Sequence, residues 1–327
     1  MLELRVDPLK NQYIAYATKR QERTFFPPKN FCPLCPTKNG NYLTEINEED
    51  FDIAVFENKF TTFSRVPNEI KEENIIKTNL EYKKEKSLGI CEVIVYSANH
   101  DIYLEEMPVK KVSNIIKVWQ DRYFELGNHD FVKYVFIFEN KGKEIGVTLT
   151  HPHGQIYAFP FIPPIPEIEL NSAKEYFLKN KRCIHCDILE QEVKLKERII
   201  FENEYFVIFI PYYAKWPYEV HIYPLRHLGS ITEINSEEVY SLAQSLQELI
   251  RRYNKLFNFR MPYVMIIHQN PTDGRRYEYN HLHFEFYPPY RTKTKLKYIA
   301  SVELAAGTFI NDTLPEEKAS ELRNIKI

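Results

Sequence analysis

The fold can be read from one short stretch of the chain, His151-Pro152-His153-Gly154-Gln155-Ile156-Tyr157. A second stretch with the same layout follows later, His281-Leu282-His283-Phe284-Glu285-Phe286-Tyr287. Alternate side chains of a β-strand share a face, so each stretch would place two histidines and one further polar residue on one surface. The sequence therefore predicts two strands with polar faces, one in each part of the chain.

The features around these stretches repeat in the same order. A glutamate is followed eight residues later by a histidine in residues 92–100 and again in residues 219–227. An asparagine precedes each quoted stretch by eleven residues, first at Asn140 and then at Asn270. Features that recur in one order along a chain indicate a duplicated unit.

Two helices are predicted within the duplicated unit. Apolar residues recur at helical spacing in residues 109–123 and again in residues 239–253, and Ser236 is placed to cap the second helix. An aromatic and β-branched strand follows each helix, in residues 134–138 and 264–268. We expect an α/β fold of the α+β type, in which two tandem halves join their antiparallel strands into one sheet with flanking helices.

The length of 327 residues suits two such halves, which we place at residues 1–165 and 166–327, with a short final helix beginning near Pro315. Charged residues nearly cancel to a net charge of −2, which gives no reason to expect a nucleic-acid partner. The N-terminus lacks the features of a signal peptide, and no stretch reaches transmembrane length. We therefore expect a cytoplasmic enzyme or binding protein without a membrane partner.

Four of the five cysteines form two pairs, whereas Cys91 stands alone in an apolar run and is expected to be a buried strand residue. Each half also supplies the histidine that ends its glutamate-to-histidine segment and the first histidine of its quoted stretch. Four such ligands match the number and type that a closed tetrahedral zinc site requires. The predicted ligands are Cys32, Cys35, His100 and His151 for one zinc ion and Cys183, Cys186, His227 and His281 for another.

Two other roles fit the cysteine pairs less well. A thioredoxin-like pair would be followed by a helix in a βαβ setting, which neither pair shows. A zinc finger would place its ligand pairs about a dozen residues apart, whereas Cys35 and His100 are separated by 65. A zinc ion with four protein ligands has no open position for water, so its expected role is structural. Of the remaining histidines, His185 is expected to face solvent, and His129 and His221 to be surface or partly buried residues.

Four segments of the chain are specific in combination: Phe138-Glu139-Asn140-Lys141-Gly142, His151-Pro152-His153-Gly154-Gln155, Tyr212-Tyr213-Ala214-Lys215-Trp216-Pro217 and Phe286-Tyr287-Pro288-Pro289. Together they resemble class I galactose-1-phosphate uridylyltransferases, members of the histidine-triad superfamily. The resemblance extends over nearly the whole chain and implies two histidine-triad-like halves. It also implies a homodimer with shared active sites.

The resemblance implies that His153 is a catalytic nucleophile. His153 would take uridylate from UDP-glucose and release glucose 1-phosphate, and galactose 1-phosphate would then attack the uridylyl-histidine to give UDP-galactose. The residue types suit this chemistry, because neutral imidazole can attack phosphorus without a separate base. Gly154 lets a phosphate approach the backbone. The Gln155 amide can donate to a phosphate oxygen but cannot titrate, which favours transfer to another phosphate over hydrolysis.

Further substrate contacts are implied by the resemblance alone. Near the nucleotide phosphates, and contributed across a dimer interface, the matching residues are Arg20 and Arg23. The uridine contacts match Asn58 and Phe60, and further phosphate contacts match Asn140 and Thr148. The contacts to the hexose phosphate match Lys297, Tyr298 and Glu303. Two departures, Val302 for a tyrosine and Phe309 for a glutamine, predict a weaker discrimination of galactose.

The resemblance also implies an alternative second metal centre, of iron or zinc. Its ligands would correspond to Glu169, His268, His283 and Glu285, the last being histidine in the better-known pattern. This replacement, together with the second cysteine pair, favours the cysteine-containing site. Only one of the two centres needs to be occupied.

Two other functions stay open. A phosphorylase or adenylyltransferase of the same superfamily would act on an ADP-sugar or on diadenosine tetraphosphate through the same histidine. A non-catalytic, zinc-stapled nucleotide-binding protein would form no covalent intermediate, and its ligand affinity would not depend on His153. The covalent label that a nucleotide sugar leaves on the chain distinguishes the three.

Overall fold

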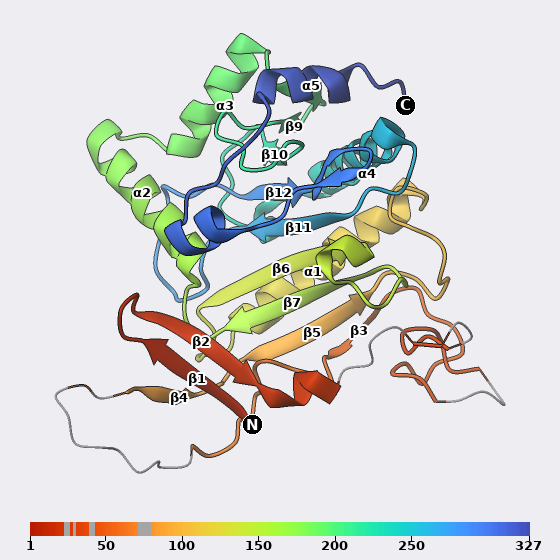
Figure 1. Cartoon of the computed structure of the whole chain (residues 1–327), viewed down its shortest axis with the longest axis vertical. Helices are drawn as coiled ribbons and strands as arrows, with labels where there is room; N and C mark the ends of the chain where they lie inside the picture. Colours follow the sequence, from red (N-terminus) through yellow and green to blue (C-terminus); the bar gives the residue numbers. More distant parts are fainter. Residues whose placement is uncertain (23–26, 29–30, 39–42, 71–79, 81) are drawn as a thin grey trace.

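The computed structural model describes residues 1–22, 27–28, 31–38, 43–70, 80 and 82–327. A nine-stranded antiparallel sheet forms its centre (Figure 1). In chain order the strands are β3 (Ala54–Glu57), β5 (Ile90–Val95), β6 (Tyr134–Lys141), β7 (His153–Phe159), β8 (Ile199–Glu202), β9 (Phe206–Phe209), β10 (Val220–Pro224), β11 (Tyr263–His268) and β12 (His283–Tyr287). Their order across the sheet is β3-β5-β7-β6-β11-β12-β10-β9-β8.

The two sides of the sheet repeat each other around the central pair β6 and β11. From this pair the strands run outward as β7 and β5 on one side and as β12 and β10 on the other. β7 and β12 occupy equivalent places and begin at the second histidine of each stretch, so His151 and His281 directly precede the strands rather than lying in them as predicted. The prediction of an α+β fold, with two tandem halves joined into one mainly antiparallel sheet, is confirmed.

Helices α1 (Val109–Gly127) and α4 (Ser236–Phe257) contact each other and pack on one face of the sheet (Figure 1). The apolar side chains predicted at helical spacing form the core between helices and sheet. Trp119 of α1 and Leu246 of α4, for example, are fully buried. The hydrophobic effect of this shared core joins the two halves into one body.

The cap of α4 differs from the prediction. Asn235, rather than Ser236, accepts hydrogen bonds from the first free backbone N–H groups of the helix, and the Glu238 side chain accepts from the Asn235 N–H at 2.8 Å. Asparagine and serine are both favourable capping residues. The helix therefore begins one residue earlier than the sequence pattern indicated.

The opposite face of the N-terminal half is covered in two places. A small sheet of β1 (Leu2–Asp7), β2 (Gln12–Ala17) and β4 (Lys84–Lys86) packs on it through Leu4, which lies against Cys91. Cys91 is buried, as predicted. Farther along this face, Leu34 packs against Val93 and Val95. The two covering segments leave room for a cavity on this side of the sheet.

The same face of the C-terminal half is covered by helices α2 (Pro164–Asn180) and α3 (Ile184–Leu195), on the left and top of Figure 1. Leu189 of α3 packs against Val207 and Phe209 of the sheet.

The shorter elements are η1 (Thr18–Glu22), η2 (Lys143–Ile145), η3 (Ile231–Glu233), β13 (Tyr290–Thr292), β14 (Lys295–Leu296), η4 (Val302–Ala306) and α5 (Pro315–Arg323). The last of these confirms the predicted final helix at Pro315. No helix among the described residues has the length and apolar character needed to cross a membrane.

Candidate functional site

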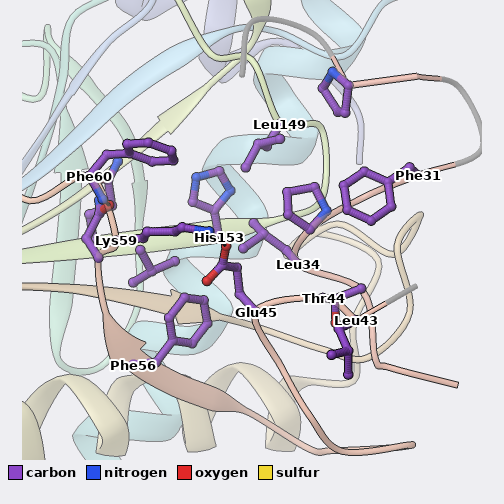
Figure 2. A pocket seen from close by; sticks show the side chains of 15 residues that line it. Phe31, Leu34, Leu43, Thr44, Glu45, Phe56, Lys59, Phe60, Leu149 and His153 are labelled. Carbon is purple, nitrogen blue, oxygen red and sulfur yellow. Dashed lines mark hydrogen bonds and ion pairs between the residues drawn. The ribbon is translucent and has the colours of Figure 1, made fainter. Parts of the chain in front are cut away.

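A cavity of about 410 Å³ lies on the face of the N-terminal half opposite α1. Its walls come from β7, from the segment after β3 and from the segment that carries the first cysteine pair. Figure 2 shows the His153 side chain between Phe60 and Lys59 on one side and Leu34 and Phe31 on the other. Ligand sites are commonly cavities of this size with apolar walls and a few polar groups. The predicted nucleophile thus lies in a candidate binding site.

His153 begins β7 and is 9% exposed. Its Nδ1 lies 2.8 Å from the carbonyl oxygen of His151, to which Nδ1–H donates a hydrogen bond. This bond selects the neutral tautomer that carries its lone pair on Nε2. An imidazole oriented in this way is suited to nucleophilic attack through Nε2.

Three more predicted residues line the same cavity: Gln155, Asn58 and Phe60. Gln155 lies two residues after His153 on the same face of β7, as the alternation predicts. The Asn58 side chain accepts a hydrogen bond from the Phe60 N–H at 2.9 Å, and the Asn58 N–H donates to the carbonyl of Cys91 at 2.8 Å. These bonds fix the segment that brings Phe60 to the cavity.

Arg20 orders the rim of this cavity within the same chain. Its Nη1 donates to the carbonyl oxygen of Phe60 at 3.3 Å and to the hydroxyls of Thr62 and Tyr157 at 3.1 and 3.0 Å. Arg20 is not itself part of the cavity wall. The second predicted arginine, Arg23, lies outside the described residues.

Asn140 and Thr148 are the two residues of the β6–β7 region that match phosphate contacts. Asn140 lines a smaller cavity of about 210 Å³, which His153 also lines. Thr148 is buried, and its hydroxyl has no hydrogen-bond partner among the described residues. A buried hydroxyl without a partner is unfavourable, and a phosphate oxygen is one group that would satisfy it.

The predicted hexose-phosphate residues lie elsewhere in the chain. Lys297, Tyr298 and Glu303 line neither of the two cavities beside His153. The Lys297 ammonium group is buried and lies 3.2 Å from the Glu303 carboxylate, whereas Tyr298 is 70% exposed. A single chain therefore does not bring these residues to the predicted nucleophile.

The first predicted set of metal ligands comes together in the structure. Ligand atoms of all four residues lie within 4.8 Å of one another in the set Cys32, Cys35, His100 and His151. The Nδ1 atoms of His100 and His151 lie 3.4 and 3.5 Å from Sγ of Cys35. Zn–S and Zn–N bonds of about 2.3 and 2.1 Å put tetrahedral zinc ligands about 3.6 Å apart. The four side chains therefore fit a zinc ion.

The surroundings of this set also suit a metal ion. Nε2 of His151 lies 2.7 Å from the Ser97 carbonyl oxygen, and Nε2 of His100 lies 3.1 Å from Oγ1 of Thr150, so both rings are held with Nδ1 toward the thiols. Burial lowers the pKa of His151 to about 4, which keeps the ring neutral. Burial also raises the pKa of the Cys32 thiol to about 12, so a nearby cation is needed to hold it as a thiolate.

The second predicted set comes together in the same way. The ligand atoms of its members also lie within 4.8 Å of one another, in Cys183, Cys186, His227 and His281. Sγ of Cys186 lies 3.3 and 3.5 Å from Nδ1 of His227 and His281. Hydrogen bonding by Cys186 lowers the pKa of Cys183, which favours the thiolate that a metal ligand requires. Cys183 directly precedes helix α3 and Cys186 lies in its first turn, so a helix does accompany this pair, contrary to the prediction, but it is preceded by α2 rather than by a strand.

The residues of the alternative metal centre are also assembled. Ligand atoms of Glu169, His268 and His283 lie within 4.8 Å of one another. Glu285 completes the group, with its carboxylate 3.4 Å from Nε2 of His283 and 3.8 Å from Nε2 of His268. Burial alone would lower the pKa of His268, but the carboxylates of Glu169 and Glu285 outweigh it and raise this pKa to about 9.

Two histidines of this region lie deeper than predicted. His185 is buried rather than solvent-facing, and its Nδ1 lies 3.1 Å from the Tyr223 hydroxyl. His221 is 1% exposed, and its Nε2 lies 3.0 Å from Glu219 and 3.4 Å from Glu285. The alternation of side chains along β10 is the signal that could have placed His221 on the polar face. No comparable pattern pointed to His185, whose burial depends on how α3 packs.

The duplicated histidines differ in what they face. Nδ1 of His283 lies 2.9 Å from the His281 carbonyl oxygen, which repeats the bond between His153 and His151. Nε2 of His283, however, lies 3.4 Å from the Glu285 carboxylate. His153 instead lines the larger cavity. The N-terminal copy is therefore the better candidate for a nucleophile.

The sequence of the chain is similar to that of known enzymes over its whole length. Family models described as Galactose-1-phosphate uridyl transferase, N-terminal domain and C-terminal domain, match residues 3–163 and 169–327. The galactose-1-phosphate uridylyltransferase of Thermotoga maritima is 39% identical over 328 residues, covering 100% of this chain and 99% of that protein. The enzyme of the same name from Saccharomyces cerevisiae is 30% identical over 347 residues, covering 98% and 93%.

Solved structures show a similar likeness. A uridylyltransferase structure aligns with a TM-score of 0.86 and 36% identity, covering 98% of this chain and 97% of that chain. An ADP-glucose phosphorylase from Arabidopsis thaliana, solved with bound ADP-glucose, aligns with a TM-score of 0.73 and 24% identity, covering 100% of both chains. At that lower identity the likeness to the phosphorylase shows a shared fold alone.

Proposed function

The chain belongs to the galactose-1-phosphate uridylyltransferase family, and on this basis we propose that it transfers a uridylyl group from UDP-glucose to galactose 1-phosphate through a covalent intermediate on His153. The chain is thus a nucleotidyltransferase of galactose metabolism. The single observation that carries the proposed intermediate is the 2.8 Å hydrogen bond from Nδ1 of His153 to the His151 carbonyl. It leaves the lone pair on Nε2 of a ring that lines a ligand-sized cavity.

In the first half-reaction Nε2 of His153 attacks the α-phosphorus of UDP-glucose. An N–P bond forms, the P–O bond to glucose 1-phosphate breaks, and its electron pair stays on the departing phosphate oxygen. The uridylylated ring gains positive charge, so the bond from Nδ1–H to the His151 carbonyl becomes stronger as the reaction proceeds. The Gln155 amide can donate to a non-bridging oxygen that gains negative charge.

In the second half-reaction a phosphate oxygen of galactose 1-phosphate attacks the same phosphorus. The N–P bond breaks, and its electron pair returns to Nε2 of His153. The acceptor phosphate is already ionised at neutral pH, so no base has to remove a proton from it. A water nucleophile would have to lose a proton, and Gln155 cannot accept one. The amide therefore favours transfer over hydrolysis.

We propose that the uridine lies against Asn58 and Phe60 and that the phosphates lie between His153, Asn140 and Thr148. The support is that the larger cavity holds the first two residues, the smaller cavity holds Asn140, and His153 lines both. Thr148 lines neither cavity, but its neighbours Val147 and Leu149 line the smaller one, and a phosphate oxygen that reached its buried hydroxyl would satisfy it. The geometry would place the α-phosphorus beside Nε2 of His153.

We propose that a homodimer completes the site. Lys297, Tyr298 and Glu303 lie away from both cavities of their own chain, and Tyr298 is exposed, as a residue presented to a second copy must be. We propose that Arg20 and Arg23 likewise reach the phosphates across the interface between the two copies. Arginine suits such a contact because its donors match phosphate oxygens. Val302, also exposed, adds no hydrogen-bonding group for the hexose.

We propose that Cys32, Cys35, His100 and His151 hold a structural zinc ion. With four protein ligands the ion would supply no open position for a substrate, so its chemistry is to fix the segments that it joins. His151 would be a ligand through Nδ1, while its carbonyl orients the nucleophile. The thiolate ligands also support a reducing compartment, for which we propose the cytoplasm.

We propose that residues 1–165 and 166–327 are duplicated halves and that Cys183, Cys186, His227 and His281 hold the second zinc ion. Zinc binds thiolate and imidazole together, and this set offers two of each in the same arrangement as the first set. The alternative centre offers two imidazoles and two carboxylates, a set of donors that also suits iron.

The metal content of two variants tests this choice. Cys186→Ser is expected to lower the zinc content of the purified protein by one ion per chain, because it removes a sulfur that lies 3.3 and 3.5 Å from Nδ1 of the two histidine ligands. His268→Gln, which alters only the alternative centre, is expected to leave the zinc content unchanged. Elemental analysis by mass spectrometry measures both. Zinc that disappears with His268→Gln and stays with Cys186→Ser would contradict the assignment.

The choice of nucleotide tests the proposed function against its nearest rival. Incubation with UDP-glucose labelled in the uridylyl group is expected to label the protein, and galactose 1-phosphate should then remove the label as UDP-galactose. Labelled ADP-glucose should leave the protein unlabelled. Stable labelling by ADP-glucose would identify a phosphorylase or adenylyltransferase instead. No labelling by either sugar, with ligand affinity unchanged in His153→Ala, would identify a binding protein.

A further inference from the structure

A buried hydrogen-bonded network lies beneath β7 and has no part in the steps above. The carboxylate of Glu139 accepts a hydrogen bond from the Tyr96 hydroxyl at 2.9 Å and another from the Tyr263 hydroxyl at 2.7 Å. Both tyrosines are at most 1% exposed. Burial raises the pKa of each phenol well above its ordinary value, so both keep their protons and act as donors.

The network joins three strands and both halves of the chain. Tyr96 directly follows β5, Glu139 lies in β6, and Tyr263 begins β11. β6 and β11 are the central pair of the sheet, so the bond between Tyr263 and Glu139 crosses the junction between the halves. The carboxylate cannot rotate without losing one of its two donors.

The Tyr96 hydroxyl lies directly against the backbone of the nucleophile segment. A methyl group at Gly154 would stand 2.5 Å from the hydroxyl oxygen of Tyr96 and 3.2 Å from the ring carbon that bears it. The first distance is well inside van der Waals contact, so residue 154 must be glycine while the hydroxyl is in place. Gly154 separates His153 from Gln155, the two β7 residues that line the larger cavity.

We infer that Tyr96, Glu139 and Tyr263 form a positioning network that fixes β7 at Gly154 and thereby the reach of His153 toward phosphorus. The inference rests on the proposed role of His153 as the nucleophile. Gly154 meets the network on the face of β7 opposite the His153 side chain, so the network acts through the backbone. In-line attack requires the reacting atoms at about 3–3.5 Å, and a misplacement of about 1 Å lowers the rate strongly.

Removal of one hydroxyl tests the network. Tyr96→Phe is expected to lower kcat about 10-fold and to change KM for UDP-glucose less than about twofold. Tyr253→Phe is the matched control, because Tyr253 is fully buried in α4 and its hydroxyl donates to the Tyr218 carbonyl at 2.7 Å. Both variants lose one buried hydrogen bond, so their melting temperatures should fall alike, but the control should keep its kcat.

A second pair of variants tests the contact with Gly154. Gly154→Ala is expected to lower kcat about 100-fold, because the new methyl group displaces β7. Adding Tyr96→Phe removes the atom at 2.5 Å and leaves neighbours at 3.2 and 3.4 Å, so kcat should recover at least about fivefold. Two unrelated destabilising changes would instead add their losses.

Several outcomes would overturn the inference. The first is an equal kcat in Tyr96→Phe and Tyr253→Phe, and the second is additive losses of kcat in the double variant. The third is a higher KM with unchanged kcat in Tyr96→Phe. This result would indicate that Tyr96 contacts substrate directly in the smaller cavity, which all three residues of the network line. If Tyr96→Phe does not fold, Tyr263→Phe removes the other donor and is read against the same control. Covalent labelling of the unchanged protein by UDP-glucose, measured alongside, separates the two proposals. If the unchanged protein is labelled and Tyr96→Phe keeps its full kcat, only the role of the network is refuted. If the unchanged protein is not labelled, the proposed function is refuted and the role of the network with it.

Discussion

Replacement of His153 by alanine is expected to lower uridylyl transfer by at least roughly 10⁴-fold, because only binding and electrostatic effects remain once a covalent nucleophile is removed. The fold should survive, since the side chain lines a cavity and does not belong to the hydrophobic core. The rate of UDP-galactose formation at saturating substrates measures the loss, and the melting temperature checks the fold.

His129→Ala is a suitable control for this variant. His129 is partly buried, lies 2.9 Å from Arg65, and lines neither cavity beside His153. We expect it to retain the full rate of transfer. If His153→Ala kept more than about a tenth of the rate, another group would have to form the intermediate.

Cys35→Ser is expected to cause the largest loss of stability. Sγ of Cys35 is the sulfur that lies closest to both histidine ligands of the first set. Zinc binding contributes on the order of 10 kcal/mol to the folding of small zinc domains, so even part of that free energy should lower the melting temperature by about 10 °C or more. We also expect one zinc ion fewer per chain and almost no transfer activity. Calorimetry and elemental analysis measure these effects.

Activity should fall with the metal because one residue serves both parts of the site. The Nδ1 atom of His151 faces the thiols, and the carbonyl of the same residue accepts the hydrogen bond that orients His153. Cys91→Ser is the control, because this cysteine is buried in the sheet and belongs to neither cysteine-histidine set. It should keep its zinc and its activity. Full activity in a stable Cys35→Ser variant would refute the link between metal and nucleophile.

The sequence was sufficient to predict both cysteine-histidine sets and most of each polar strand face, although His151 and His281 directly precede their strands. The reason is that the cysteines and histidines of each half follow one another in the same order. Either set alone would be a weak indication of a metal site, but the repeat makes each set support the other. The alternation of side chains along a strand then placed His153 and Gln155 on one face, where the structure has them. Periodicity likewise predicted α1 and α4, because each helix has one continuous apolar face.

Other parts of the site depend on packing that no local pattern encodes. Tyr96, Glu139 and Tyr263 meet across three strands, and nothing in the sequence near any of them indicates the other two. The burial of His185 depends on how α3 lies over β10 and β12, and its place inside a cysteine pair wrongly suggested a solvent-facing residue. Tertiary contacts of this kind decide burial more strongly than the neighbours in sequence.

The position of the hexose-phosphate residues shows a different limit. Lys297 and Glu303 were assigned by resemblance, and resemblance says which residues take part in a site but not which copy of the chain provides them. In the structure they pair with each other at 3.2 Å, away from both cavities. Their proposed role therefore depends on a second chain.

The central claim is that one nitrogen of His153 becomes bonded to phosphorus during the reaction. Intact-mass measurement of the protein after mixing with UDP-glucose tests it most directly. We expect a single adduct with the mass of one uridylyl group, labile in acid, removed by galactose 1-phosphate and absent from His153→Gly. An adduct of the same mass on His153→Gly, or UDP-galactose formation by that variant at the normal rate, would contradict the claim.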